Sequence, residues 1–311
     1  MKVLITGGAG FIGSHLADRL LARGDVVRVI DNFSTGRRDN LTSHANLVIM
    51  EGSIATGDLV HYVNGGFKPD VVVHAAASYQ DPDNWLEDVE TNVKGTANVV
   101  RYARQYNVKR LIYFQTSLCY GYPKDATPIP IDAPQAPAIA SYAITKTAAE
   151  NYIAFSGIDY ISFRLANAYG PRNLSGPTPT FYQRLTTGKG IYAAKTRRDF
   201  IYIDDLLQLV LMAIDGKGSR GAYHASTGSD YAIKQMADAV VKALGMTYEV
   251  PERERAPDDV ERILLDPSKT IRDFGWKPTT PLETGVAAAV EWYKTHEITR
   301  TYTHLRNYEQ D

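Results

Sequence analysis

The spacing of apolar and polar positions along the chain predicts a parallel α/β sheet. Val3–Thr6 is a short run of β-forming residues, and Gly7 ends it. From Phe11 onward, apolar residues return every three or four positions, which is typical of a helix packed on one face. A second β-rich run, Val26–Ile30, follows that helix. Strand, tight turn, helix and strand in this order predict the first half of a nucleotide-binding unit.

Further apolar runs of strand length repeat this alternation. We expect strands at Leu47–Met50, Val71–Ala77, Leu111–Ser117 and Tyr160–Leu165. Helical spacing between them predicts helices over 56–63, 83–106 and 141–155. Because strands and helices alternate, the chain favours right-handed βαβ units in a doubly wound parallel sheet.

The composition changes beyond Asn167, where Pro, Gly and Thr accumulate in a stretch typical of a loop that leaves the sheet. The elements expected after it are helices near Ile233–Leu244 and Leu282–His296, and strands near Phe200–Ile203 and Tyr223–Ala225 that return to the main sheet. The sequence thus predicts a first domain over 1–166, joined by elements near 198–227, and a smaller domain over 167–311.

Charge and cysteine content narrow the functional classes. The 311 residues carry a formal charge of −1, so the chain has no overall attraction to nucleic acid or to an anionic membrane. A single cysteine, Cys119, excludes an intramolecular disulfide and suits a reducing compartment. Met1 leads directly into a predicted core strand, and no apolar run is long enough to cross a bilayer. We therefore expect a cytoplasmic protein that binds neither nucleic acid nor membrane.

The first turn carries the features of a dinucleotide site. Its glycines recur at three-residue spacing, as Gly7, Gly10 and Gly13. They allow a sharp turn, close approach to a pyrophosphate and tight packing of helix on strand, although an ordinary βα turn remains the alternative. Asp31 ends the second strand 18 residues after Gly13, where a carboxylate can accept hydrogen bonds from ribose hydroxyls. Asp31 favours NAD, whereas the nearby Arg37 and Arg38 could accept the 2′-phosphate of NADP.

Tyr142 and Lys146 are the first candidate catalytic pair. They lie four residues apart on a predicted helix and so project from one face. A lysine ammonium in that position can lower the pKa of the phenol and hydrogen-bond a cofactor ribose, which leaves the tyrosine as a general base. The same spacing recurs from Tyr120 to Lys124, but that segment contains a glycine and a proline and cannot be helical.

Two further side chains lie at expected strand ends. Thr116 would bring a hydroxyl to the carboxyl edge of the sheet, where it can orient a reacting alcohol or simply cap the strand. His74 ends the buried run that begins at Val71. A hydrogen-bonded core role is the better interpretation of this histidine, because no partner spacing indicates catalysis or a metal site.

Six motifs follow one another along almost the whole chain: TGGAGFIG, NVKGT at Asn92–Thr96, QTSLCYG, SYAITK, RLANAYGPR and RRDFIYIDDL. Together they resemble the extended short-chain dehydrogenase/reductase superfamily, specifically its NAD-dependent nucleotide-sugar epimerases and dehydratases. AAASYQDPDNW and QTSLCYG are most similar to the lipopolysaccharide O-antigen sugar epimerases, which are UDP-glucose 4-epimerase-like. The resemblance implies a Rossmann domain with bound NAD, a smaller C-terminal α/β domain that binds a nucleoside diphosphate sugar, and a homodimer.

The resemblance also implies roles for individual residues. Tyr142 would be the base, Lys146 its partner, and Thr116 the hydroxyl at the family's Ser/Thr position. The implied cofactor contacts are Gly7, Gly10, Phe11, Ile12, Gly13, Asp31, Asn32, Ser53, Ile54, Ala75, Ala76 and Asn92, together with Tyr142 and Lys146. The implied substrate contacts are Ser117, Asn167, Arg198 and Arg255.

Two positions depart from the family pattern. Many members bind the adenine amine through an aspartate where this chain has Ser53 and Ile54, so a backbone contact would have to substitute. Members also carry an arginine in an R-x-G-D stretch that binds the diphosphate. Here Ala256 takes that place and Arg255 precedes it by one residue.

The implied reaction begins when Tyr142 takes the proton of a sugar hydroxyl, at C4, while hydride passes to NAD and leaves a 4-keto sugar. Return of the hydride to the opposite face gives the 4-epimer. Related 4,6-dehydratases and decarboxylases carry an acid directly after the threonine or one position further, whereas this chain has Ser117 and Leu118. A dehydratase, a decarboxylase and a non-catalytic nucleotide-binding sensor remain alternatives. The intact tyrosine and lysine favour an enzyme.

Apolar residues on more than one face of the predicted helices over 83–106 and 141–155 favour a second contact besides the sheet. Together with the resemblance, they predict that two copies of the chain pair these helices in a four-helix bundle.

Overall fold

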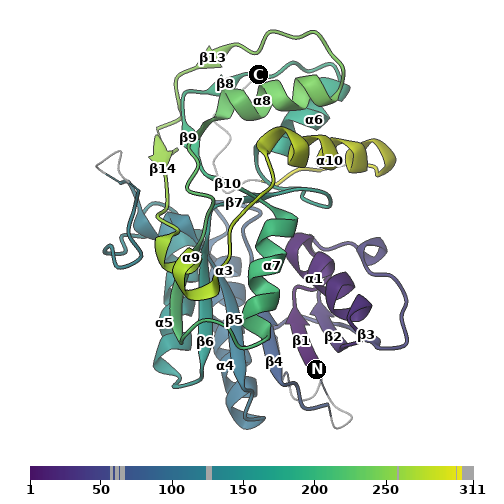
Figure 1. The fold of residues 1–311 in the computed structure, drawn as a ribbon, viewed down its shortest axis with the longest axis vertical. Helices are drawn as coiled ribbons and strands as arrows, with labels where there is room; N and C mark the ends of the chain where they lie inside the picture. Colours follow the sequence, from purple (N-terminus) through teal and green to yellow (C-terminus); the bar gives the residue numbers. More distant parts are fainter. Residues whose placement is uncertain are drawn as a thin grey trace.

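A seven-stranded parallel sheet forms the centre of the molecule (Figure 1). The computed structural model describes residues 1–56, 59, 63, 67–123, 128–257, 259–298 and 300–302. The strands are β1 (Lys2–Thr6), β2 (Val26–Asp31), β3 (Leu47–Glu51), β4 (Val71–His74), β5 (Arg110–Thr116), β6 (Tyr160–Leu165) and β11 (Gly221–Ala225). Their order in the sheet is β11-β6-β5-β4-β1-β2-β3. The chain adds strands outward from β1 on one side and from β4 on the other, so the predicted doubly wound Rossmann fold is confirmed.

Helices cover both faces of the sheet because the strands are apolar on both sides. Helices α1 (Phe11–Ala22) and α7 (Ile203–Ile214) pack on one face, and α4 (Gly95–Gln105) and α5 (Ser141–Phe155) pack on the other. Alternate residues of β1 enter the two cores, since Ile5 lies in the first and Leu4 in the second. A continuous apolar strand is therefore buried on both sides, as in other parallel sheets.

The segment over 83–106 is helical, but the prediction of one regular α-helix is wrong. The segment divides into α3 (Trp85–Asp88), a π-helical turn η2 (Val89–Lys94) and α4. The wider turn accompanies the buried side chain of Asn92, which hydrogen-bonds both the N–H and the carbonyl of Ser78. Most of the helix predicted over 56–63 lies outside the described residues, as does Lys124 of the second Tyr–Lys spacing.

A second layer lies beyond one edge of the sheet, in the upper part of Figure 1. Helices α6 (Pro177–Thr186), α8 (Ile233–Ala243) and α10 (Leu282–Thr295) share a separate apolar core. Short strands frame this layer: β8 (Ala193–Ala194) pairs with β13 (Glu252–Arg253), and β9 (Arg197–Arg198) pairs with β12 (Tyr231–Ala232) and β14 (Arg262–Ile263). The prediction of a loop after Asn167 is thus partly wrong. The proline-rich stretch contains the start of α6, with a proline in the first turn of that helix.

The chain returns to the first core after leaving it. Strand β11 lies beside β6, helix α7 packs on the sheet, and α9 (Ser268–Phe274) packs against β11. The expected return of Phe200–Ile203 to the main sheet is wrong. Strand β10 (Phe200–Tyr202) pairs instead with β7 (Asn167–Tyr169), the strand that follows β6 after one residue. The domain division at residue 166 stays a prediction.

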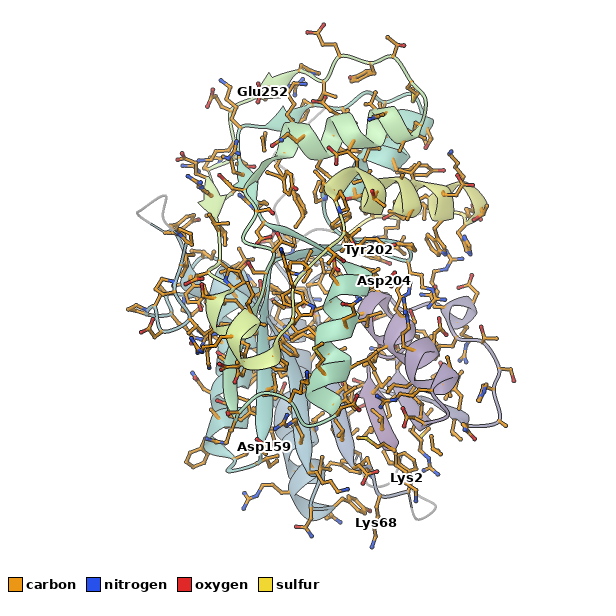
Figure 2. The ribbon with its side chains drawn as sticks, viewed as in Figure 1. Lys2, Lys68, Asp159, Tyr202, Asp204 and Glu252 are labelled. Carbon is orange, nitrogen blue, oxygen red and sulfur yellow. The ribbon has the colours of Figure 1, made fainter. Side chains whose placement is uncertain are left out.

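The strands run towards the second layer. In Figure 2, Lys2, Lys68 and Asp159 mark the edge at which β1, β4 and β6 begin, far from Glu252. Their carboxyl ends therefore meet the second layer, and ligands of open α/β sheets bind at such ends. Within the described part of the chain, no helix is both long and apolar enough to cross a membrane.

Candidate active site

A cleft of about 870 Å³ lies between the carboxyl ends of the strands and the second layer. Most of the predicted site residues line it: Gly7, Gly10, Phe11, Ile12, Gly13, Asp31, Asn32, Ser53, Ile54, Ala75, Ala76, Thr116, Ser117, Tyr142, Lys146, Asn167 and Arg198. As far as the described residues define its wall, Asn92 and Arg255 do not contribute to it. The structure therefore brings 17 of the 19 predicted residues together in one cleft.

The first turn requires glycine for steric reasons. Gly7 has a φ of 69°, and a Cβ there would lie 2.6 Å from the backbone nitrogen of Ala76. A Cβ on Gly13 would lie 2.3 Å from the carbonyl oxygen of Gly7. Helix α1 begins directly after Gly10, so its free N–H groups face the cleft. The turn thus leaves space and N–H donors for a pyrophosphate.

Asp31 is held by the backbone around the same turn. Its two carboxylate oxygens accept hydrogen bonds from the N–H groups of Ala9 and Phe33, each at 2.8 Å. Burial raises the pKa of Asp31, while these N–H groups partly offset that effect. The carboxylate is fixed at the end of β2 and borders the cleft, where a ribose would lie.

The two arginines considered as 2′-phosphate contacts of NADP are engaged elsewhere. Arg37 forms an ion pair with Asp39 at 2.6 Å, and Arg38 pairs with Glu51. Neither arginine borders the cleft, whereas Asp31 does. The structure therefore supports the interpretation that Asp31 sets the cofactor preference.

Tyr142 and Lys146 lie one turn apart on α5, and both reach the cleft. The Lys146 ammonium lies 4.1 Å from the ring centroid of Tyr113, and burial lowers its pKa to about 7. Burial raises the pKa of Tyr142, and the neighbouring Tyr79 and Asp88 raise it further. The lowering of the Tyr142 pKa by Lys146 stays a prediction, since burial has the larger effect on Tyr142 in this arrangement.

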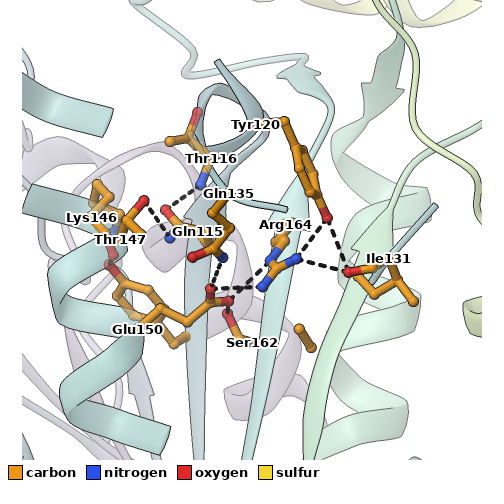
Figure 3. A network of polar contacts seen from close by, with 12 residues as sticks. Gln115, Thr116, Tyr120, Ile131, Gln135, Lys146, Thr147, Glu150, Ser162 and Arg164 are labelled. Carbon is orange, nitrogen blue, oxygen red and sulfur yellow. Dashed lines mark hydrogen bonds and ion pairs between the residues drawn. The ribbon is translucent and has the colours of Figure 1, made fainter. Parts of the chain in front are cut away.

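The end of β5 is tied to α5 by an amide side chain. Gln115 accepts a hydrogen bond from the N–H of Thr116 at 2.9 Å and donates to the hydroxyl of Thr147 at 3.5 Å (Figure 3). The Thr116 hydroxyl caps the next turn by accepting from the N–H of Leu118, and it also borders the cleft. The capping role of Thr116 is therefore present in the structure, and its role in orienting a reacting alcohol stays a prediction.

A buried ionic network supports the same helix (Figure 3). Glu150, one turn beyond Lys146, pairs with Arg164 at 3.0 Å and accepts hydrogen bonds from Gln135 and Ser162. Both ends of the Arg164–Glu150 pair are nearly inaccessible to water, and removing one partner from such a pair leaves an uncompensated charge. The network therefore fixes α5 against β6 and holds the Tyr142–Lys146 face in place.

His74 has a structural role, as the sequence favoured. Its ring nitrogens lie 2.7 Å from the Thr6 hydroxyl and 2.8 Å from the Thr96 hydroxyl. Burial lowers the pKa of His74 to about 3, so the ring is neutral at physiological pH. The described residues include no group of three or more His, Cys, Asp and Glu side chains placed to hold a metal ion.

The substrate side has one well-placed arginine. Arg198 pairs with Asp259 at 2.5 Å, and both side chains are largely buried at the edge of the cleft. Burial lowers the pKa of Arg198, and Asp259 offsets this effect. Arg255 donates instead to the carbonyl of Asp259 at 2.8 Å, and Ala256 borders the cleft in its place. Arg255 as a substrate contact stays a prediction, and in this structure its guanidinium is bonded to backbone outside the cleft.

Asn92 as a direct cofactor contact also stays a prediction, since its side chain does not line the cleft in this structure. The side chain is buried behind the cleft wall and bonds Ser78, which itself borders the cleft. It also donates to the hydroxyl of Thr145 on α5 at 3.1 Å. In this structure Asn92 thus positions the loop after β4.

Several residues of the cleft wall escaped the sequence analysis: Tyr79, Gln115, Thr178, Phe181, Gln183, Thr301 and Tyr302. Helix α6 supplies three of them, and its proline-rich start resembles a loop in sequence. The apolar spacing within α6 was the signal available for them. Nothing in the sequence alone places the C-terminal segment beside the cleft.

The chain is similar to known proteins over nearly its whole length. The sequence model of the NAD dependent epimerase/dehydratase family matches residues 3–226. The "Putative UDP-glucose 4-epimerase" of Methanocaldococcus jannaschii is 30% identical, over 96% of this chain and 100% of that protein. The "UDP-glucuronic acid decarboxylase 1" of Xenopus tropicalis is 27% identical, over 94% of this chain and 72% of that protein.

Solved structures give the same result at higher identity. The Bordetella bronchiseptica enzyme WbmH, in complex with NAD+, is 52% identical with a TM-score of 0.90, over 94% of this chain and 98% of that chain. The enzyme WbmG of the same organism, in complex with NAD and UDP, is 43% identical with a TM-score of 0.89, over 98% of each chain.

Proposed function

Since the chain belongs to the NAD dependent epimerase/dehydratase family, we propose that it inverts C4 of a nucleoside diphosphate sugar, with UDP as the nucleotide, through a transient 4-keto sugar. The resemblance drawn from the motifs is confirmed at the level of the family, whose cofactor is NAD. One observation carries the proposal: Tyr142, Lys146 and Thr116 border the same cleft as the glycine turn and Asp31.

The cofactor half of the cleft fits NAD. The glycine turn leaves space that a Cβ would fill, and α1 begins beside it, as a pyrophosphate requires. Asp31 is fixed where a ribose diol can donate to it, and the carboxylate would repel a 2′-phosphate. When bound, NAD takes up a hydride from the sugar and returns it.

The chain's own residues handle the proton. We assign Tyr142 as the group that removes the proton of the sugar hydroxyl and returns it, with Thr116 orienting that hydroxyl. The raised pKa of Tyr142 means that deprotonation needs nearby positive charge. Lys146, on the same face of α5, is the buried cation available to supply it.

Leu118 separates this proposal from its alternatives within the family. Elimination of water or loss of carbon dioxide needs a further acid or base beside the sugar. The two residues after Thr116 are Ser117 and Leu118, and the leucine neither donates nor accepts a proton. The keto sugar therefore lacks a group at these positions to divert it, which favours simple re-reduction.

Turnover with a panel of nucleotide sugars tests the proposal. The purified protein would be incubated with UDP-glucose, UDP-N-acetylglucosamine, UDP-glucuronic acid and the dTDP, CDP and GDP analogues, while product mass and stereochemistry are followed together. We expect an isomer of unchanged mass with inverted C4 from a UDP-sugar. A product lighter by one water or one carbon dioxide would assign the protein to the dehydratases or decarboxylases, and no turnover would favour the sensor.

We also propose that the protein is a cytoplasmic homodimer paired through α3, α4 and α5. Large apolar side chains on α3, η2 and α5 are exposed: Trp85, Leu86, Val89, Ile144, Tyr152 and Phe155. Leu86 is 80% exposed and Phe155 89%, which is unusual for a monomer surface. Light scattering should give twice the chain mass at micromolar concentration. Leu86→Glu combined with Phe155→Glu should give a monomer, whereas a wild-type monomer would contradict the pairing.

A further inference from the structure

The described segment after α10 returns to the cleft. Residues 296–298 and 300–302, here called the C-terminal strap, follow α10. Its start is fixed on that helix, because the ring of His296 stacks on Trp292 with centroids 4.1 Å apart. At its other end, Thr301 and Tyr302 border the cleft. The strap therefore forms part of the cleft wall, although none of its residues belongs to a recognised motif.

Hydrogen bonds attach the strap to both halves of the molecule. On the cofactor side, Arg37 of the loop after β2 donates to the carbonyl of Glu297 at 2.9 Å. On the substrate side, Gln183 of α6 donates to the carbonyl of Ile298 at 3.1 Å. The strap thus connects the loop after β2, which follows Asp31, to helix α6, which borders the substrate half of the cleft.

The last described residue is held in a fixed place. Tyr302 donates its N–H to the carbonyl of Leu174 at 2.8 Å, and its own carbonyl accepts from the N–H of Gly176 at 3.2 Å. These two bonds form a parallel bridge with Ser175, which also borders the cleft. Backbone bonds therefore set the position of the Tyr302 ring.

Three tyrosine rings then form a row from the strap to the reacting centre. The ring centroids of Tyr302 and Tyr79 lie 6.3 Å apart, and those of Tyr79 and Tyr142 also lie 6.3 Å apart, both in edge-to-face geometry. The Tyr79 hydroxyl lies within hydrogen-bonding reach of Thr35, another residue of the cofactor half. The row therefore runs from Tyr302 on the strap, past Tyr79, to the proposed base Tyr142 on α5.

We propose that the C-terminal strap closes the cofactor groove and that Tyr302 and Tyr79 are further binding residues for the NAD held beneath them. The geometry supports this role because the strap joins the groove's loop to the substrate layer, and the tyrosine row covers the path between them. Burial raises the pKa of Tyr79 to about 12, so its hydroxyl stays protonated and can donate to a phosphate or ribose oxygen.

The closing role of the strap rests on the proposed function in one respect, the return of the hydride to the same sugar. A reaction that returns the hydride to the same sugar never needs to exchange its cofactor, so a closed groove costs it no turnover. A closed groove also keeps the keto sugar and the reduced cofactor together until the hydride is returned.

The rate at which the holoprotein releases NAD tests the proposal without any sugar present. Released NAD would be trapped by an excess of a second dehydrogenase and measured over time. We expect Tyr302→Ala to release NAD about tenfold faster than the wild type, because one edge-to-face ring contact and its burial are lost. Tyr302→Phe keeps the ring and should behave as the wild type.

A second pair of variants separates the strap from general effects on the loop. Arg37→Ala removes the bond to Glu297 and should also speed release. Arg38→Ala is the matched control, because Arg38 comes next in the chain and pairs with Glu51 on β3 instead. Circular dichroism and the thermal midpoint establish that each variant is folded, and Arg37→Ala remains informative if Tyr302→Ala is not.

The outcomes are distinct. Faster release in Tyr302→Ala and Arg37→Ala, with Arg38→Ala and Tyr302→Phe unchanged, supports the strap as part of the cofactor site. Release at the wild-type rate in both Tyr302→Ala and Arg37→Ala overturns it. Failure of the proposed function would appear separately, as absence of turnover with every nucleotide sugar, and would leave the release comparison valid.

Discussion

The two walls of the cleft are built by different means. The cofactor wall, formed by the carboxyl ends of β1, β2, β4 and β5, depends on backbone geometry: Gly7 and Gly13 leave no room for a side chain. The substrate wall, formed by α6, β9 and the segment that carries Asp259, depends on side chains such as Arg198 and Asp259 that come from distant parts of the sequence. A wall made of backbone tolerates little change, whereas a wall made of side chains can be altered one contact at a time.

This difference explains how a family can keep its cofactor and vary its substrate. The glycine turn of the first wall belongs to one βαβ unit with local constraints, so a substitution there disturbs the fold and the cofactor together. The second wall joins segments as distant as Asn167 and Asp259, and its members can change without altering the sheet. Variants in the two walls should therefore fail in different ways, and a variant between them should lose chemistry alone.

The largest effect is expected at the junction of the two walls. Tyr142→Phe removes one oxygen atom and keeps the ring that packs near Tyr79. Turnover should fall roughly 10²–10⁴-fold, the usual contribution of a general base, while NAD content and UDP affinity stay at wild-type values. Steady-state kinetics with the substrate identified from the panel, together with NAD content, measure both. Turnover near that of the wild type would remove Tyr142 from the mechanism.

A smaller but broader loss is expected in the cofactor wall. Gly13→Ala places a Cβ 2.3 Å from a backbone carbonyl oxygen, so the turn or α1 must move. We expect NAD affinity to fall by about a hundredfold and the thermal midpoint to fall with it. Gly24→Ala is the matched control for a glycine in the same domain, since a Cβ there meets open space, although its φ of 86° adds strain of its own. Equal NAD affinity in Gly13→Ala and the wild type would mean that the turn does not bind the dinucleotide.

The same contrast governs what the sequence could predict. Strands, the α5 face of Tyr142 and Lys146, and the glycine turn follow from local periodicity and sterics, and these predictions agree with the structure. Burial raises the pKa of Tyr142, and the neighbouring Tyr79 and Asp88 raise it further, which local spacing does not reveal. The features that the sequence pattern alone does not predict therefore depend on tertiary contacts.

The position of a residue in a motif also does not predict the direction of its side chain. Asn92 and Arg255 were assigned from motif position, yet their side chains bond backbone outside the cleft. Strand β10 was expected in the main sheet from its apolar character, and Ile201 does enter that core while the backbone pairs with β7. An apolar run predicts burial, but it does not predict which strand supplies the hydrogen bonds.

The smallest effect is expected in the substrate wall, where two neighbouring arginines can be compared. Arg198→Lys keeps the positive charge beside Asp259 but loses the planar fork that can bind two phosphate oxygens. UDP affinity, measured by calorimetry, should fall about tenfold, while NAD affinity stays unchanged. Keeping a cation at this position avoids leaving the Asp259 carboxylate buried without a partner, which would destabilise the fold and confuse the measurement.

Arg255→Lys is the matched control for this experiment, because Arg255 points to the backbone carbonyls of Ala256 and Asp259 and not into the cleft. It should change UDP affinity by less than about twofold, as expected for an exposed residue outside a binding site. The pair of variants therefore discriminates between the two arginines that motif position had treated alike. If Arg255→Lys weakens UDP binding as much as Arg198→Lys does, then Arg255 turns towards the diphosphate when the nucleotide binds, and the substrate wall rearranges on binding in a way that the cofactor wall, fixed by its glycines, cannot.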